Sequence, residues 1–181
     1  MEFKYYDKSW MPAIKGAFLI LFGLIAVSQI VGSIRSLASL FILLIAAIAI
    51  MQLSSGILLK KSRFRLWSVI TGAINLLFCL LLALKIEAPR ETIVLVLMLW
   101  IIFQAICEIA EAGILISLRN AFAALFLLNA LLTLLFGYFL NVVSGNFTPQ
   151  GVFYVGLIAL VFGLANELSA YLLTRIKKED N

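Results

Sequence analysis

The feature that most constrains this chain is a series of long apolar runs, separated by short polar or charged breaks. A helix needs about 20 mostly apolar residues to cross a bilayer, and each run is close to that length or longer. Unbroken apolar runs indicate helices, because the strands of a membrane barrel show short alternating patterns instead. The sequence therefore predicts an all-α polytopic membrane protein with six transmembrane helices. They are Pro12–Ile34, Leu37–Leu59, Leu66–Leu84, Thr92–Leu118, Ala121–Val143 and Gly151–Thr174.

The composition agrees with this class of protein. Of the 181 residues, 64% are hydrophobic and 13% are charged, whereas a soluble domain has roughly 45–50% apolar and about 25% charged residues. The first apolar run is longer than the core of a signal peptide, so we expect it to remain as a spanning helix. The breaks leave no room for a soluble domain. Residues 1–181 are expected to form a single membrane domain.

The basic residues predict the orientation of the helices. Lys and Arg residues collect on the cytoplasmic side of membrane proteins. In the predicted topology one side carries eleven of them, against Arg35, Lys85 and Arg90 on the other. Both termini are therefore expected to be cytoplasmic. The eleven are Lys4, Lys8, Lys15, Lys60, Lys61, Arg63, Arg65, Arg119, Arg175, Lys177 and Lys178.

One break, "KKSRFR", gathers four of these basic residues, Lys60, Lys61, Arg63 and Arg65. A basic break of this kind acts as a topology signal. It could also bind anionic lipid headgroups. Because the basic residues sit in short segments between apolar runs, the positive charge does not indicate nucleic-acid binding.

A short motif recurs along the chain and indicates an internal repeat. It reads "GAFLILFG" at Gly16–Gly23, "GAINLLFC" at Gly72–Cys79 and "ALLTLLFG" at Ala130–Gly137, with offsets of 56 and 58 residues. The sequence predicts three tandem helical hairpins, with units at about 10–62, 63–119 and 120–176. Each unit crosses the membrane twice, so the repeats should be parallel about a pseudo-three-fold axis along the membrane normal. The small residues would let helices approach closely.

These motifs resemble the HdeD-type acid-resistance membrane proteins, a family of short two-helix repeats. The resemblance covers nearly the whole chain and rests on a Trp and two small residues in the odd helices, with a Gly near the end of the even ones. It implies a multi-pass protein of the bacterial inner membrane with a role in survival in acid, and it supplies no catalytic residues. The matching positions are Trp10, Gly16, Gly23, Trp67, Gly72 and Cys79, with Gly56 and Gly113.

Polar side chains inside the spans are the candidate functional residues, because ionisable groups at mid-helix cost about 2.5–3.5 kcal/mol on insertion scales. Glu108 and Glu111 share one helix face, and Glu167 lies 56 residues after Glu111, at an equivalent repeat position. Lys15 is the cation that can pair with them. The predicted polar layer consists of Gln52, Asn75, Glu108, Glu111, Asn129, Asn166 and Glu167.

Two interpretations of this layer stand side by side. In the functional one it is a proton- or cation-accepting site, since crowding and removal from water favour protonated carboxylates and oxygen ligands suit a hard cation. In the structural one, protonated glutamates join helices by hydrogen bonds, or Lys15 forms an ion pair. The two cysteines lie inside apolar runs and are expected to be core residues.

No enzyme is predicted. The chain has no histidine, no phosphate-binding glycine loop and no metal-ligand spacing, so no catalytic group, cofactor or metal is expected. The function predicted from sequence is that of a non-enzymatic integral membrane protein, acting in acid or envelope stress. One alternative is a small proton- or cation-coupled transporter, and another is an accessory or scaffold subunit of a membrane complex. The possible protein partners are copies of the same chain, in a homo-oligomer, or the other subunits of such a complex. The lipid bilayer is the expected environment.

Overall fold

The computed structural model describes residues 10–28, 34–58, 64–117, 123–145 and 149–179. All regular structure in these residues is helical. Five of the helices are long and apolar enough to cross a membrane, while the apolar part of α1, Ala13–Val27, is shorter. A multi-pass membrane protein is therefore confirmed in outline. The helices are α1 (Trp10–Val27), α2 (Ile34–Leu58), α3 (Phe64–Leu84), α4 (Arg90–Ser117), α5 (Ala123–Gly145) and α6 (Pro149–Glu179).

The helix ends follow local chemistry and correct one predicted boundary. The first predicted span continued to Ile34, but α1 ends at Val27 and Ile34 already begins α2. Ser28 ends α1, since its amide donates to the Leu24 carbonyl (3.0 Å) and its hydroxyl donates to the Ile25 carbonyl (2.7 Å). At the other end of the chain, α6 begins on Pro149, a residue suited to the first turn of a helix.

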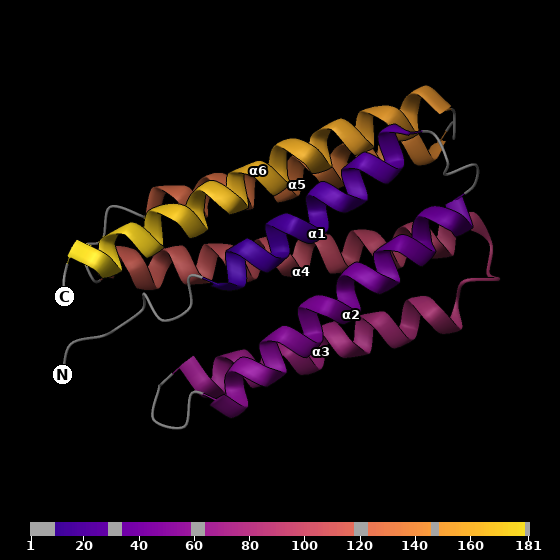
Figure 1. Ribbon diagram of the computed structural model, residues 1–181. Coiled ribbons are helices and arrows are strands. Elements are labelled where there is room, and N and C mark those ends of the chain that lie inside the picture. Colours follow the sequence, from indigo (N-terminus) through magenta and orange to yellow (C-terminus); the bar gives the residue numbers. More distant parts are fainter. Residues whose placement is uncertain (1–9, 29–33, 59–63, 118–122, 146–148, 180–181) are drawn as a thin grey trace.

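The helices form an elongated bundle in which neighbours along the chain run in opposite directions (Figure 1). The start of α1 and the end of α6 lie at the same end of this bundle. The three most closely packed pairs are α1 with α6, α2 with α3, and α4 with α5. The two helices of each hairpin predicted from the repeat, such as α1 and α2, make much less contact.

Glycines allow the close approach of α1 and α6. A Cβ atom built on Gly16 would lie 2.8 Å from the Gly163 carbonyl oxygen, and one on Gly23 would lie 2.8 Å from the Gly156 carbonyl oxygen. Only residues without a side chain fit such a contact, because the neighbouring atoms are backbone. The prediction that small residues bring helices together is confirmed here. The partners Gly156 and Gly163 repeat the seven-residue spacing of Gly16 and Gly23.

Aromatic rings fill the centre of the bundle. Phe41 of α2 lies 4.8 Å from Phe22 of α1, 6.0 Å from Trp100 of α4 and 5.9 Å from Phe136 of α5, measured between ring centroids. All four residues belong to one buried cluster. Cys79 and Cys107 are also buried and free, which confirms that they are core residues. Many Leu and Ile side chains point outward, as expected for helices in a lipid environment.

Candidate functional site

A buried ion pair and its immediate contacts bring together four of the helices. The ammonium of Lys15 on α1 pairs with Oε1 of Glu108 on α4, and the side chains are only 16% and 9% exposed. The second carboxylate oxygen, Oε2, accepts a hydrogen bond of 2.7 Å from the Thr133 hydroxyl on α5. Lys15 Nζ also lies 4.9 Å from the centroid of the Phe162 ring on α6, a distance typical of a cation–π contact. Glu108 thus has a partner on each of its oxygens.

A second polar group links α2, α3 and α4 through Asn75, which is fully buried. The Asn75 amide nitrogen donates to the Gln52 side-chain oxygen (2.7 Å). Its own oxygen accepts from the Gln104 amide (2.6 Å) and from the Trp100 indole (2.8 Å). Every polar atom of the Asn75 side chain is therefore used, as burial inside a membrane requires.

Helix α4 holds the two polar groups together. Trp100, Gln104 and Glu108 follow each other at intervals of four residues, so they lie along one face of the helix. The first two belong to the Asn75 network and the third to the ion pair. The two polar groups together contain side chains from all six helices, and α4 is the helix that contributes to both.

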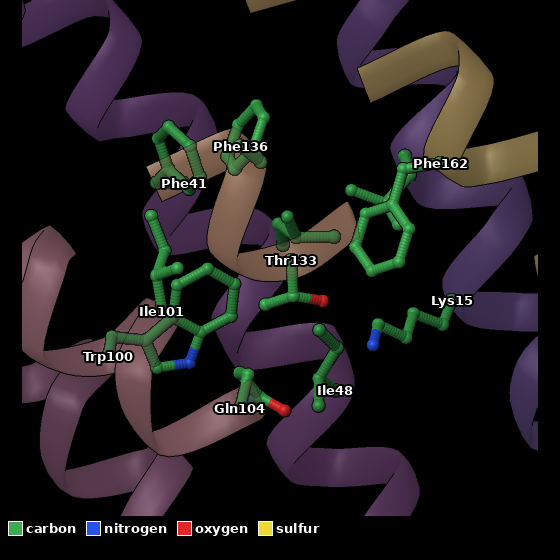
Figure 2. A pocket seen from close by; sticks show the side chains of 11 residues that line it. Lys15, Phe41, Ile48, Trp100, Ile101, Gln104, Thr133, Phe136 and Phe162 are labelled. Carbon is green, nitrogen blue, oxygen red and sulfur yellow. The ribbon is translucent and has the colours of Figure 1, made fainter. Parts of the chain in front are cut away.

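A small cavity of about 20 Å³ lies beside the ion pair. A cavity of this size has room for about one water molecule. Figure 2 shows Lys15 reaching from α1 toward Thr133, with Trp100 and Gln104 across the space from it. The lining is almost wholly apolar. It consists of Lys15, Leu19, Phe41, Leu44, Ile48, Trp100, Ile101, Gln104, Thr133, Phe136 and Phe162.

The structure brings together only part of the predicted layer. Gln52, Asn75 and Glu108 enter the two polar groups described above. Asn166 instead donates to the Phe162 carbonyl of its own helix (2.9 Å). Glu167 is half-buried, and its Cγ lies 3.0 Å from where a Cβ on Gly16 would stand, so its stem packs against α1.

Of the remaining predicted residues, Glu111 is half-buried and Asn129 is buried, both within helices. Arg65 is exposed at the start of α3. Lys60, Lys61 and Arg63 lie outside the described residues. In the described segments no group of three His, Cys, Asp or Glu side chains could hold a metal ion. The cation beside Glu108 is Lys15.

Three hydrogen-bonding members of the site escaped the sequence-based prediction: Trp100, Gln104 and Thr133. Each carried a signal. A Trp in an apolar helix brings an indole N–H that needs an acceptor. Gln104 precedes Glu108 by one helical turn, and Thr133 follows Asn129 by one turn, which places each on a face already known to be polar.

Comparisons of this chain with known protein families, with curated proteins and with solved structures gave no match.

Proposed function

We propose that this chain is a non-enzymatic, acid-responsive integral membrane protein whose response begins at Glu108. The observation that carries the proposal is the ion pair between Glu108 and Lys15, closed off among four helices. Buried ion pairs hold only while both partners are charged, since removal of one charge leaves the other unpaired away from water. The pair is therefore an element of the fold that acid can break.

Acid acts on this pair through its carboxylate. A proton on Glu108 would leave the Lys15 ammonium without its charged partner among apolar side chains. Lys15, six residues into α1, could then extend toward the interface. Among the described residues, Cys107 and Glu111 lie near the pair on α4, and Glu167 of α6 packs against α1 at Gly16. The acid response would loosen α1 and α6 from α4 and α5.

The proposal includes six spans across a bacterial inner membrane, with both termini on its cytoplasmic side. The close packing of α1 along the spanning helix α6 supports counting α1 as a span, and the distribution of basic residues supports the orientation. The acid-resistance role also draws on the resemblance of the repeated motifs to HdeD-type proteins.

Two further observations support a triplicated hairpin. Gln52, Glu108 and Asn166 are separated by 56 and 58 residues, the offsets that relate Gly16, Gly72 and Ala130. These offsets favour Glu108 with Asn166, rather than Glu111 with Glu167, as equivalent positions. In addition, each of the three close helix pairs joins the second helix of one unit to the first helix of the next, with α6 and α1 closing the ring.

The test compares wild type, Glu108→Gln and the matched control Glu111→Gln, each purified in detergent micelles. Tryptophan fluorescence is followed while the pH is lowered stepwise from neutrality. Wild type and Glu111→Gln should show a reversible transition, because Trp100 lies on the same face of α4 as Glu108. Glu108→Gln should show none.

The same variants test the role in the cell. Deletion of the gene should lower survival in acid, and wild type or Glu111→Gln should restore it, whereas Glu108→Gln should not. Unchanged survival after deletion would reject the acid-resistance role. A transition that persists in Glu108→Gln would reject Glu108 as its origin.

A further inference from the structure

The surroundings of Lys15 Nζ have the chemistry of a receptor for an ammonium ion. A carboxylate oxygen of Glu108 pairs with it, and the face of the Phe162 ring lies 4.9 Å away. Carboxylates and the faces of aromatic rings are the two groups that proteins use to hold organic ammonium ions. The Thr133 hydroxyl fixes the carboxylate from its other side. The ammonium of Lys15 thus occupies a site built for a positive charge.

The cavity extends this site with apolar walls. Phe41, Trp100, Ile101 and Phe136 line the space beside the Lys15 ammonium, as Figure 2 shows. A free cation such as sodium finds few oxygen ligands here, whereas an alkyl chain finds aromatic and aliphatic contacts. Lys15 lines this space and pairs with the Glu108 carboxylate just beyond the lining. The two features together suit a molecule with a charged amine at one end and hydrocarbon at the other.

We propose that this cavity is a binding site for a lipophilic primary alkylammonium ion, which competes with Lys15 for Glu108. Lys15 acts as a tethered occupant. When an amine takes its place, the lysine can extend toward the interface, because its side chain is already 16% exposed and it lies near the start of α1. The space left by its four-carbon stem adds to the existing cavity of about 20 Å³, so an amine with a four-carbon chain fits the vacated site.

The probe is n-butylammonium, which reproduces the lysine side chain beyond its Cα, and n-butanol is its uncharged counterpart. Thermal unfolding of the full chain in detergent is measured at about pH 7.5, where an alkylamine is charged. Lys15→Ala should unfold at a higher temperature with butylammonium and should respond little to butanol. Wild type should need a concentration about tenfold higher or more for the same shift, because the tethered lysine competes at high effective concentration.

The double variant Lys15→Ala with Glu108→Gln separates the carboxylate from the cavity. It should show no preference for butylammonium over butanol. Equal stabilisation of Lys15→Ala by both compounds, or an unchanged effect of butylammonium in the double variant, would overturn the proposal. If Lys15→Ala does not fold, the test uses the tryptophan fluorescence of folded wild type and folded Glu108→Gln. Butylammonium should then change it saturably in wild type but not in Glu108→Gln, and no saturable change in wild type would overturn the proposal.

The inference does not rest on the acid response. Amine binding is measured at a constant pH near neutrality, and the acid response is measured without amine. Failure of one experiment therefore leaves the other proposal standing.

Discussion

At the scale of single residues, Glu108 shows how a carboxylate persists inside a bundle of apolar helices. Each of its oxygens has a partner from a different helix, Lys15 on α1 and Thr133 on α5. The sequence could indicate that Lys15 was available to pair with the glutamates, since it is a cation inside a predicted span. It could not indicate which glutamate takes part, because Glu108 and Glu111 differ by less than one helical turn and only packing separates their directions.

Thr133→Val tests the support that the Glu108 carboxylate receives. The change keeps the shape of the side chain and removes the hydrogen bond to Oε2. We expect the free energy of unfolding to fall by about 1–2 kcal/mol, because a bond to a charged group exceeds the average for polar contacts in membrane helices. Reversible unfolding in mixed micelles, followed by circular dichroism, measures the change.

The matched control is Thr71→Val on α3. Thr71 is also buried, but within the described residues its hydroxyl donates to carbonyls of its own helix, those of Trp67 and Ser68. The control should lose clearly less stability than Thr133→Val. Equal losses would mean that the Thr133 hydroxyl contributes nothing specific to Glu108.

At the scale of helices, α4 and the α1–α6 pair show two different reasons for a helix to lie where it does. Helix α4 presents polar side chains to its neighbours along one face, while α1 and α6 meet backbone to backbone through glycines. The length and type of the helices followed from the apolar runs. Their pairing did not, because α1 and α6 are separated by more than 100 residues and any small-residue face could have met any other.

Gly163→Ala tests the contact between α1 and α6. A Cβ atom here would lie 2.9 Å from the Gly16 carbonyl oxygen, so the helices must move apart. We expect the free energy of unfolding to fall by about 1–3 kcal/mol, the usual cost of overpacking. The measurement is the same reversible unfolding in mixed micelles.

Gly113→Ala on α4 is its control, since a Cβ atom on Gly113 would meet nothing within 4 Å. Alanine is the better helix former by about 1 kcal/mol, so this variant should keep or gain stability. Similar behaviour of the two variants would show that the α1–α6 contact tolerates separation.

At the scale of the whole molecule, the three closely packed helix pairs, α1 with α6, α2 with α3 and α4 with α5, are linked into a ring. The chain leaves one pair and enters the next at each of the loops between α1 and α2, α3 and α4, and α5 and α6, and α6 returns to α1. Sequence repeats can predict that such units exist. They cannot predict whether a unit packs within itself or with its neighbour, because both arrangements keep the same residues apolar. The polar groups connect the pairs, with the Glu108 ion pair tying α1 to α4.

The proposed topology of six spans predicts which residues reach each side of the membrane. In a background with Cys79→Ala and Cys107→Ala, single cysteines replace Arg35, Arg65 or Glu87, all of which are exposed, and an epitope tag is added at the N-terminus. A membrane-impermeant maleimide applied to intact cells should label Arg35→Cys and Glu87→Cys. Both positions lie at the same end of the bundle, because Arg35 and Glu87 form an ion pair (3.0 Å). Arg65→Cys and the tag should become accessible only after permeabilisation, because basic residues stay on the cytoplasmic side.

The tag and Arg35→Cys lie on either side of α1, so their accessibility from the same side would show that α1 does not span. A fully reversed pattern would instead keep the six spans and invert the orientation.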